Sequence, residues 1–168
     1  ILPIKNESRY ISDALDSIIK QKYFTGKVEI IIADGMSIDG TRKIINSYKE
    51  KHENIKVIDN DFFYVAQGFN IALSIAEGDI IIRLDGHAKL KSDYIVSCLN
   101  ALKRKDASCV GGVTEHISES FFGSLIVFCQ SSKFGSGGVS FRSKIDKGKY
   151  VSTLAFGAYK REVFEKIG

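Results

Sequence analysis

The sequence lacks the features that mark several classes of protein. It has only three cysteines, Cys98, Cys109 and Cys129, and none belongs to a CxxC pair, so neither a disulfide framework nor a zinc knuckle is expected. Three buried thiols in a reducing, cytosolic protein fit this number. No apolar run approaches the roughly 20 residues that span a bilayer, and no charged-then-apolar leader precedes a cleavage site. We therefore expect a cytoplasmic protein.

Charge of one sign is also scarce. The chain carries 24 basic and 20 acidic residues, spread along its length, for a net charge of +4. This excess is too small to predict binding to nucleic acid, and a weakly cationic surface is the simpler interpretation.

What the chain does have is enough apolar content for one core. It contains 168 residues, 44% of them hydrophobic, with no internal repeat and no obvious linker. These features predict a single domain over residues 1–168. The chain opens on Ile1 without methionine and stops at Gly168 just after a helix-like segment. We expect a domain that is truncated at both ends.

Short apolar runs alternate with amphipathic segments along the first 105 residues. The apolar runs have the composition of buried parallel strands and cover Ile1–Ile4, Val28–Ala33, Ile55–Ile58 and Ile80–Leu84. Helical spacing of apolar residues occurs within Ile11–Ile19, Thr41–Tyr48, Val65–Ala76 and Ile95–Leu102. A further strand is expected at Tyr150–Phe156, before a helix from Lys160. The pattern predicts an α/β fold of the Rossmann-like kind, a mostly parallel sheet with helices on both faces.

Polar residues follow three of the predicted strands. Lys5, Asn6 and Glu7 follow the first strand, Asp34 the second, and Asp85 with His87 the fourth. Ligands of open α/β sheets collect at the carboxyl ends of the strands, so these side chains are expected to share one cleft.

The pair Asp85 and His87 is a candidate cation site. A carboxylate oxygen and an imidazole nitrogen suit a manganese-like ion better than magnesium, and Gly86 between them gives the backbone freedom to turn both side chains toward one point. The alternative is a solvated Asp-Gly turn with His87 as a chance neighbour. Spacing alone does not separate the two.

Four motifs in order resemble the glycosyltransferase family 2, inverting enzymes with the GT-A fold, and in particular its bacterial exopolysaccharide branch, which includes succinoglycan biosynthesis. The motifs are "ILPIKNES", "EIIIADGMSIDGT", "QGFNIALSIAEGDIIIRLDGHA" and "FGAYKREVFEKIG". The resemblance covers essentially the whole chain. It is specific for fold and reaction class, but it does not name the sugar.

The resemblance implies roles for particular residues. Asp34 would read the uracil edge and Glu7 would lie near the ribose, while Asp85 matches the first acid of the family's DxD metal motif and His87 stands at the second. Gly157 and Ala158 would lie where the sugars approach. The implied nucleotide-binding set is Pro3, Asn6, Glu7, Asp34, Gln67, Asn70 and Asp85. The implied metal ligands are Asp85 and His87, for Mn²⁺ or Mg²⁺.

Several of these residues have a second interpretation. Asp34 and Asp39 could cap a helix in an ordinary βα loop, and Asn70 could be a satisfied core amide. The stretch "FGSGGV" at 134–139 could cradle phosphate through its amides or simply connect two elements. The aromatic run Phe121–Phe128 could pack in the core, or contact the inner face of the cell membrane if the acceptor is lipid-linked.

The implied activity is transfer of a sugar from a UDP-sugar to a glycan or lipid-linked acceptor, with inversion, in the synthesis of cell-surface polysaccharide. The general base of the family lies in an acidic motif downstream, and we expect it beyond Gly168. The main alternative is a non-catalytic nucleotide-sugar-binding module. An oxidoreductase is disfavoured because "KNES", and not a glycine fingerprint, follows the first strand.

Overall fold

The computed structural model describes residues 1–22, 25–105, 107–118, 120–131, 150–151 and 154–167. By its internal contacts the chain divides into two units. The first comprises Ile1–Val110 with Ala158–Gly168, and the second comprises Gly111–Gly157. That all 168 residues form a single domain stays a prediction.

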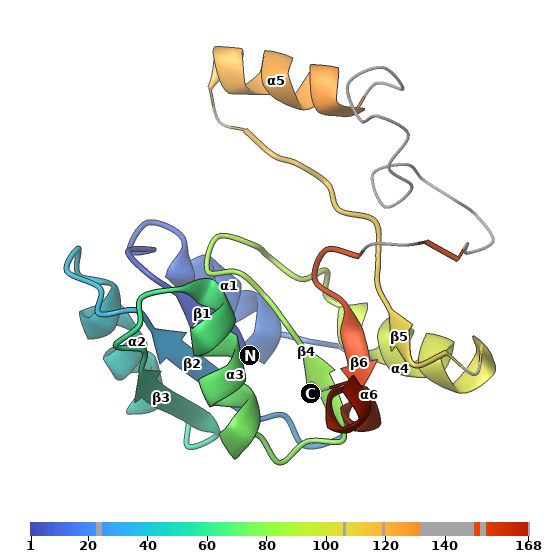
Figure 1. The fold of residues 1–168 in the computed structure, drawn as a ribbon. Helices are drawn as coiled ribbons and strands as arrows, with labels where there is room; N and C mark the ends of the chain where they lie inside the picture. Colours follow the sequence, from blue (N-terminus) through green and yellow to red (C-terminus); the bar gives the residue numbers. More distant parts are fainter. Residues whose placement is uncertain (23–24, 106, 119, 132–149, 152–153, 168) are drawn as a thin grey trace. The chain divides into compact units, whose positions relative to one another are not determined.

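The first unit alternates strands and helices, at the predicted places from β1 to α4 (Figure 1). Its elements are β1 (Leu2–Ile4), α1 (Ile11–Ile19), β2 (Ile30–Asp34), α2 (Thr41–Lys49), β3 (Ile55–Asp59), α3 (Val65–Ile75), β4 (Ile80–Ile82), α4 (Tyr94–Lys105), β5 (Cys109–Val110), β6 (Ala158–Lys160) and α6 (Arg161–Ile167).

The strands form a parallel and an antiparallel sheet. The first has the order β1-β2-β3, is parallel throughout, and pairs Ile4 with Asp34 and Asp34 with Asp59. The second has the order β4-β6-β5, with β6 antiparallel to both neighbours. The parallel ladder confirms the fold class that the apolar runs predict.

Two hydrogen bonds join the sheets next to β1. The Ile1 nitrogen donates to the Ile82 carbonyl at 2.8 Å, and the Leu84 N–H donates to the Ile1 carbonyl at 3.0 Å. This pair of bonds is the pattern of a parallel bridge, so β4 runs beside β1 in the same direction. The strand order becomes β3-β2-β1-β4-β6-β5. The chain reverses its direction of travel across the sheet between β1 and β4, and such a switch point is where open α/β sheets bind ligands.

Apolar side chains explain why the helices lie where they do. Every residue of β2 is buried, which requires cover on both faces of the sheet. Right-handed crossovers place α1 and α2 on one face and α3, which follows the reversal, on the other. Figure 1 shows α3 in front of the strands and α1 behind them. Close packing of α3 depends on Gly68, because a Cβ there would lie 2.7 Å from Asn60 Nδ2 and 3.3 Å from Pro3 Cβ.

The strand expected at Tyr150–Phe156 is wrong. Among its described residues none is in a strand, and the strand β6 begins later, at Ala158. Phe156 has a φ of 54°, a left-handed conformation that an extended strand excludes. The chain therefore turns at Phe156, and Ala158 pairs with Ile82 on one side and Val110 on the other.

The second unit contains α5 (Phe121–Ser131), which covers the predicted aromatic run. Phe121, Phe122 and Phe128 each expose about three quarters of their surface. Within the part of the chain that the structure describes, no helix combines the length and the apolar character needed to cross a membrane.

Candidate functional site

The loops that follow β1 and β2 are tied together by Asn6 and Ser37. The Asn6 N–H donates to Ser37 Oγ at 2.8 Å, and Asn6 Oδ1 accepts the Ile38 N–H at 2.9 Å. Asn6 has a φ of 55°, a left-handed conformation that asparagine tolerates better than most residues. Asn6 therefore fixes the shape of both loops, a role that the motif alone does not show.

A second set of bonds fixes the start of α2 against the β1 loop. The N–H groups of Glu7 and Ser8 donate to Thr41 Oγ1 at 2.8 Å and Asp39 Oδ2 at 3.0 Å. Asp39 Oδ1 accepts the Thr41 hydroxyl at 2.5 Å and the Thr41 N–H at 3.0 Å. Together these bonds hold the pKa of Asp39 well below its usual range, and the bond from the Thr41 hydroxyl has the largest effect. Asp39 thus bonds to the first residue of α2, but the N-cap position of that helix is Gly40, which makes no side-chain cap hydrogen bond.

This shift gives a pH-dependent prediction for Asp39→Asn. A carboxylate whose pKa is lower in the folded chain stabilises the fold above its unfolded pKa of about 3.9, and that contribution is lost as the pH falls through the folded pKa. Asp39→Asn should therefore be less stable than wild type at neutral pH, and the difference should shrink below about pH 4. Urea unfolding across this pH range measures it, with the exposed Glu53→Gln as control. A difference that stays constant down to the lowest pH would contradict the assignment.

Asp34 lies at the end of β2 and is fully buried. Its Oδ1 accepts the Ser37 hydroxyl at 2.5 Å and the Ser37 N–H at 3.2 Å, while Oδ2 accepts Arg42 Nε at 2.7 Å. Arg42 also bonds through Nη2 to Asp59, at the end of β3. Through Arg42, Asp34 thus connects the ends of β2 and β3 to the start of α2. Its predicted contact with the uracil edge stays a prediction.

The loop after β4 brings Asp85, Gly86 and His87 to the same edge of the sheet. Asp85 Oδ1 accepts Arg83 Nη2 at 2.9 Å, and about a quarter of the Asp85 side chain is exposed. His87 Nδ1 lies 2.8 Å from Glu7 Oε1. The predicted convergence of the β1 and β4 loops is therefore seen directly, across the switch point.

Gly86 is the residue that permits this approach. A Cβ at position 86 would lie 2.8 Å from Glu7 Cγ and 3.0 Å from Ile4 Cγ2, closer than real Cβ contacts. Packing therefore favours glycine here, whereas the φ of Gly86 lies outside the left-handed region, so the backbone freedom that the sequence suggested is not what selects it.

We predict that Gly86→Ala lowers the free energy of unfolding by about 2 kcal/mol, the usual cost of overpacking, which is a fall in Tm of roughly 4–8 °C. The matched control is Gly78→Ala, where the nearest atoms to an added Cβ are at 3.6 Å. That variant should be unchanged or slightly more stable. Thermal unfolding of both compares them, and equal Tm values would rule out the tight contact.

The other predicted residues lie in different surroundings. Pro3 is buried in β1, while Gln67 and Asn70 are exposed on α3. Asn70 is therefore not a core amide, and its predicted contact with nucleotide stays a prediction, as does that of Gln67. The stretch at 134–139, proposed as a phosphate cradle, lies outside the described residues.

The sequence reasoning missed Ser37, Thr41 and Arg42. The hydroxyls lie in the same motif as Asp34, and hydroxyls just before a helix commonly bond to the backbone, which was the available signal. Arg42 gave no such signal, because its two carboxylate partners come from different strands. An exposed aromatic was also missed: Phe63 lies after β3, with the Lys5 ammonium 4.5 Å from its ring centroid.

The donor set fits a divalent cation only together with a ligand. Within the described ranges, no three His, Cys, Asp or Glu side chains gather closely enough to hold a metal ion. Mg²⁺ commonly takes only one or two protein carboxylates and completes its shell with substrate phosphates and water. Asp85 supplies one such carboxylate, the His87 imidazole suits Mn²⁺ better than Mg²⁺, and a diphosphate would supply the remaining oxygens.

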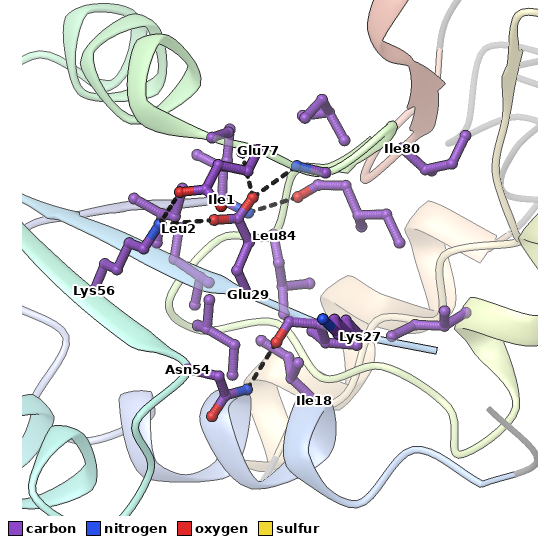
Figure 2. Close-up of a pocket in the computed structure, with 18 of the residues that line it drawn as sticks. Ile1, Leu2, Ile18, Lys27, Glu29, Asn54, Lys56, Glu77, Ile80 and Leu84 are labelled. Atoms are coloured by element: carbon purple, nitrogen blue, oxygen red, sulfur yellow. Dashed lines mark hydrogen bonds and ion pairs between the residues drawn. The ribbon is translucent and has the colours of Figure 1, made fainter. Parts of the chain in front are cut away.

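A cavity of about 830 Å³ is lined by residues at the amino ends of the strands, by β4 and Leu84, and by Leu90 and two residues of α4 (Figure 2). It is lined largely by aliphatic side chains, together with three acidic and two basic ones, and one of the two lysines, Lys56, pairs with two of the acids. Lys56 Nζ lies 3.2 Å from Glu29 and 3.0 Å from Glu77, and Glu29 Oε1 accepts the N–H groups of Glu77 and Gly78. Burial raises the pKa of Glu29, but these bonds outweigh it and leave the pKa below its ordinary value. Because acidic side chains outnumber basic ones and Lys56 is already paired, this cavity offers little to an anionic ligand.

Comparison with known proteins gives a consistent result. The model of "Glycosyl transferase family 2" matches residues 1–168. The chain is 28% identical to a dolichyl N-acetyl-alpha-D-glucosaminyl phosphate 3-beta-D-2,3-diacetamido-2,3-dideoxy-beta-D-glucuronosyltransferase of Methanococcus voltae, over 99% of this chain and 53% of that protein. It is also 28% identical to the succinoglycan biosynthesis protein ExoA of Rhizobium meliloti, over 85% of this chain and 44% of that protein. The chain thus spans about half the length of these relatives.

Solved structures share the fold. S. aureus TarS in complex with UDP superposes with a TM-score of 0.66 at 18% identity, over 99% of this chain and 47% of that one. The mannosyltransferase PcManGT of Pyrobaculum calidifontis, in complex with GDP-Man and Mn²⁺, gives a TM-score of 0.69 at 22% identity, over 99% and 45%. These likenesses confirm the GT-A fold class.

Proposed function

Because this chain belongs to glycosyl transferase family 2, we propose that it forms the donor-binding part of an enzyme that transfers a sugar from a UDP-sugar to a glycan or lipid-linked acceptor with inversion. The observation that carries the proposal is the joining of the β1, β2 and β4 loops at the switch point. There Asn6 contacts Ser37 and Ile38, and Glu7 contacts His87. We call these three loops, residues 5–9, 35–40 and 85–89, the carboxyl-end loops.

The chemistry of the carboxyl-end loops suits a nucleoside diphosphate. Hydrogen bonds between the loops after β1 and β2 hold their backbones in place, and Asp85 with His87 stands at the end of β4. A divalent cation bound at Asp85 and His87 would neutralise the charge that develops on the leaving diphosphate. TarS with UDP and PcManGT with GDP-Man and Mn²⁺, which share the fold, support this choice of ligand and cofactor.

The acceptor side is proposed from the needs of the reaction and from the surface of α5. The inverting reaction needs a carboxylate within hydrogen-bond reach of the acceptor hydroxyl. No described acid is placed in that role by its contacts, so the base stays a prediction beyond Gly168. The exposed aromatic residues of α5 support a lipid-linked acceptor at a membrane surface.

Thermal unfolding with nucleotides tests the donor assignment. UDP with Mn²⁺ at about 100 times its Kd should stabilise the chain by about 2.7 kcal/mol, a rise in Tm of roughly 5–10 °C. Uridine, which has no diphosphate, should give a much smaller rise, and GDP reports on base selectivity. Equal rises with UDP and uridine would overturn the diphosphate site, and stabilisation by UDP without release of UDP from a donor by the full-length protein would favour the non-catalytic alternative.

A further inference from the structure

The contact between Glu7 and His87 joins residues 80 positions apart. Glu7 Oε1 lies 2.8 Å from His87 Nδ1, with the Glu7 side chain 18% and the His87 ring 58% exposed. An ionised carboxylate only accepts hydrogen bonds, so the proton of a neutral imidazole lies on Nδ1. Nε2 is then left with its lone pair. This is the state that a metal-binding histidine needs, and such histidines usually donate their other N–H to a carboxylate or carbonyl.

Glu7 itself is held in place by its backbone. Its N–H donates to Thr41 Oγ1 at 2.8 Å, and its carbonyl accepts the N–H groups of Tyr10 and Ile11, both at 2.9 Å. Its side chain packs on Gly86, where even a Cβ would collide with it. Because hydrogen bonds hold its backbone and Gly86 packs against its side chain, Glu7 can set the orientation of the more exposed His87 ring.

The site does not offer Glu7 as a third ligand. Across the described part of the chain, no cluster of three His, Cys, Asp or Glu side chains reaches metal-binding geometry. In the same part of the chain, the only side-chain hydrogen bond or ion pair seen for Asp85 is the one between its Oδ1 and Arg83. Asp85 and His87 are then the two candidate metal ligands, and Glu7 is hydrogen-bonded to the imidazole.

We propose that Glu7 is a positioning residue: it fixes the Nδ1–H tautomer and the ring orientation of His87, so that Nε2 is directed to a divalent cation shared with the diphosphate. This differs from the ribose contact that the family resemblance implies for Glu7. The inference rests on the proposed function for the identity of the cation's second partner. The tautomer itself follows from the contact alone.

The tautomer is tested first, without metal or nucleotide. Nitrogen-15 NMR of the imidazole at about pH 8, where histidine is neutral, should show His87 with its proton on Nδ1 in the wild-type chain. Glu7→Ala should move the proton to Nε2, the commoner tautomer in water. His52, whose ring stacks on Tyr48 and for which no hydrogen bond to a carboxylate is seen in the described part of the chain, serves as an internal reference. An Nε2–H tautomer in wild type would overturn the proposal.

Metal affinity is tested next, by electron paramagnetic resonance of Mn²⁺ with UDP present. Glu7→Ala should weaken Mn²⁺ binding by about 10-fold to 100-fold, the usual loss for such a partner, and Glu7→Gln, which keeps an acceptor oxygen, should retain most of the affinity. In a His87→Ala background, Glu7→Ala should add little, because the two act as one unit.

The matched control is Asp13→Ala. Asp13 also links α1 to the loop after β4, through a 2.6 Å contact with Lys89, but it does not touch the imidazole. Its loss should leave Mn²⁺ affinity unchanged. Equal losses in Asp13→Ala and Glu7→Ala, or additive losses in Glu7→Ala and His87→Ala, would overturn the positioning role. The Nδ1–H tautomer combined with no Mn²⁺ or UDP binding would instead overturn the proposed function.

Discussion

Asp85→Ala is expected to weaken UDP binding, measured by calorimetry with Mn²⁺ present, by about 100-fold. The variant removes the one carboxylate at the end of β4 that can hold the cation, and an interaction with a charged group is worth roughly 1.5–3 kcal/mol. Without a divalent cation, wild type and variant should bind UDP with similar low affinity. The ion pair with Arg83 is partly exposed, so its loss should change the free energy of unfolding by less than about 1 kcal/mol.

The matched control for this variant is Asp79→Ala. Asp79 is an exposed acid at the other end of the same strand, beside the cavity of Figure 2. It should leave UDP affinity unchanged. If Asp79→Ala weakened binding as much as Asp85→Ala, the ligand would not be at the carboxyl ends of the strands.

Arg42→Ala is expected to lower the free energy of unfolding by about 3 kcal/mol, a fall in Tm of roughly 6–12 °C. Arg42 Nε contacts Asp34, whose side chain is 1% exposed, and removing Arg42 leaves that buried carboxylate without its cation. Two bonds from Ser37 remain, which keeps the loss at the lower end for a buried pair. Urea unfolding measures the change.

Asp59→Asn separates the two halves of this ion-pair network. Asp59 is the other partner of Arg42 and is 59% exposed, so its contribution should be below about 1 kcal/mol. Arg42→Lys keeps the charge but loses the fork that reaches both carboxylates, and it should fall between the two. Equal destabilisation by Arg42→Ala and Asp59→Asn would show that the buried half carries no special weight.

Much of the fold could be predicted because its signals are local. The apolar runs and the helical spacing located β1–β4 and α1–α4, and the family model and the solved structures confirm the resemblance that the four motifs carried. The short strand β6 was placed wrongly because its position is set by pairing with Ile82 and Val110, not by its own sequence. The turn at Phe156 left no composition signal.

The site could be predicted only as a set of positions. Parallel strands bring their carboxyl ends to one edge, which is why Glu7, Asp34 and His87 were expected together. The sequence does not reveal which side chains meet there. The burial of Asp34 against Arg42 and the contact of Glu7 with His87 depend on packing between segments far apart in the chain. The roles assigned to Gln67 and Asn70 came from the resemblance, and their exposed positions neither confirm nor exclude them.

The proposed function requires the nucleotide to bind at the carboxyl-end loops and not in the cavity at the amino ends of the strands. Amide chemical-shift mapping by NMR tests it most directly, with UDP and Mg²⁺, which avoids the line broadening of Mn²⁺. Binding at the carboxyl-end loops predicts that UDP shifts the amide signals of residues 5–9, 35–40 and 85–89. It leaves the amide signals of the cavity, around Glu29, Asn54 and Glu77, unchanged (Figure 2). Shifts confined to Glu29, Asn54 and Glu77 would contradict it.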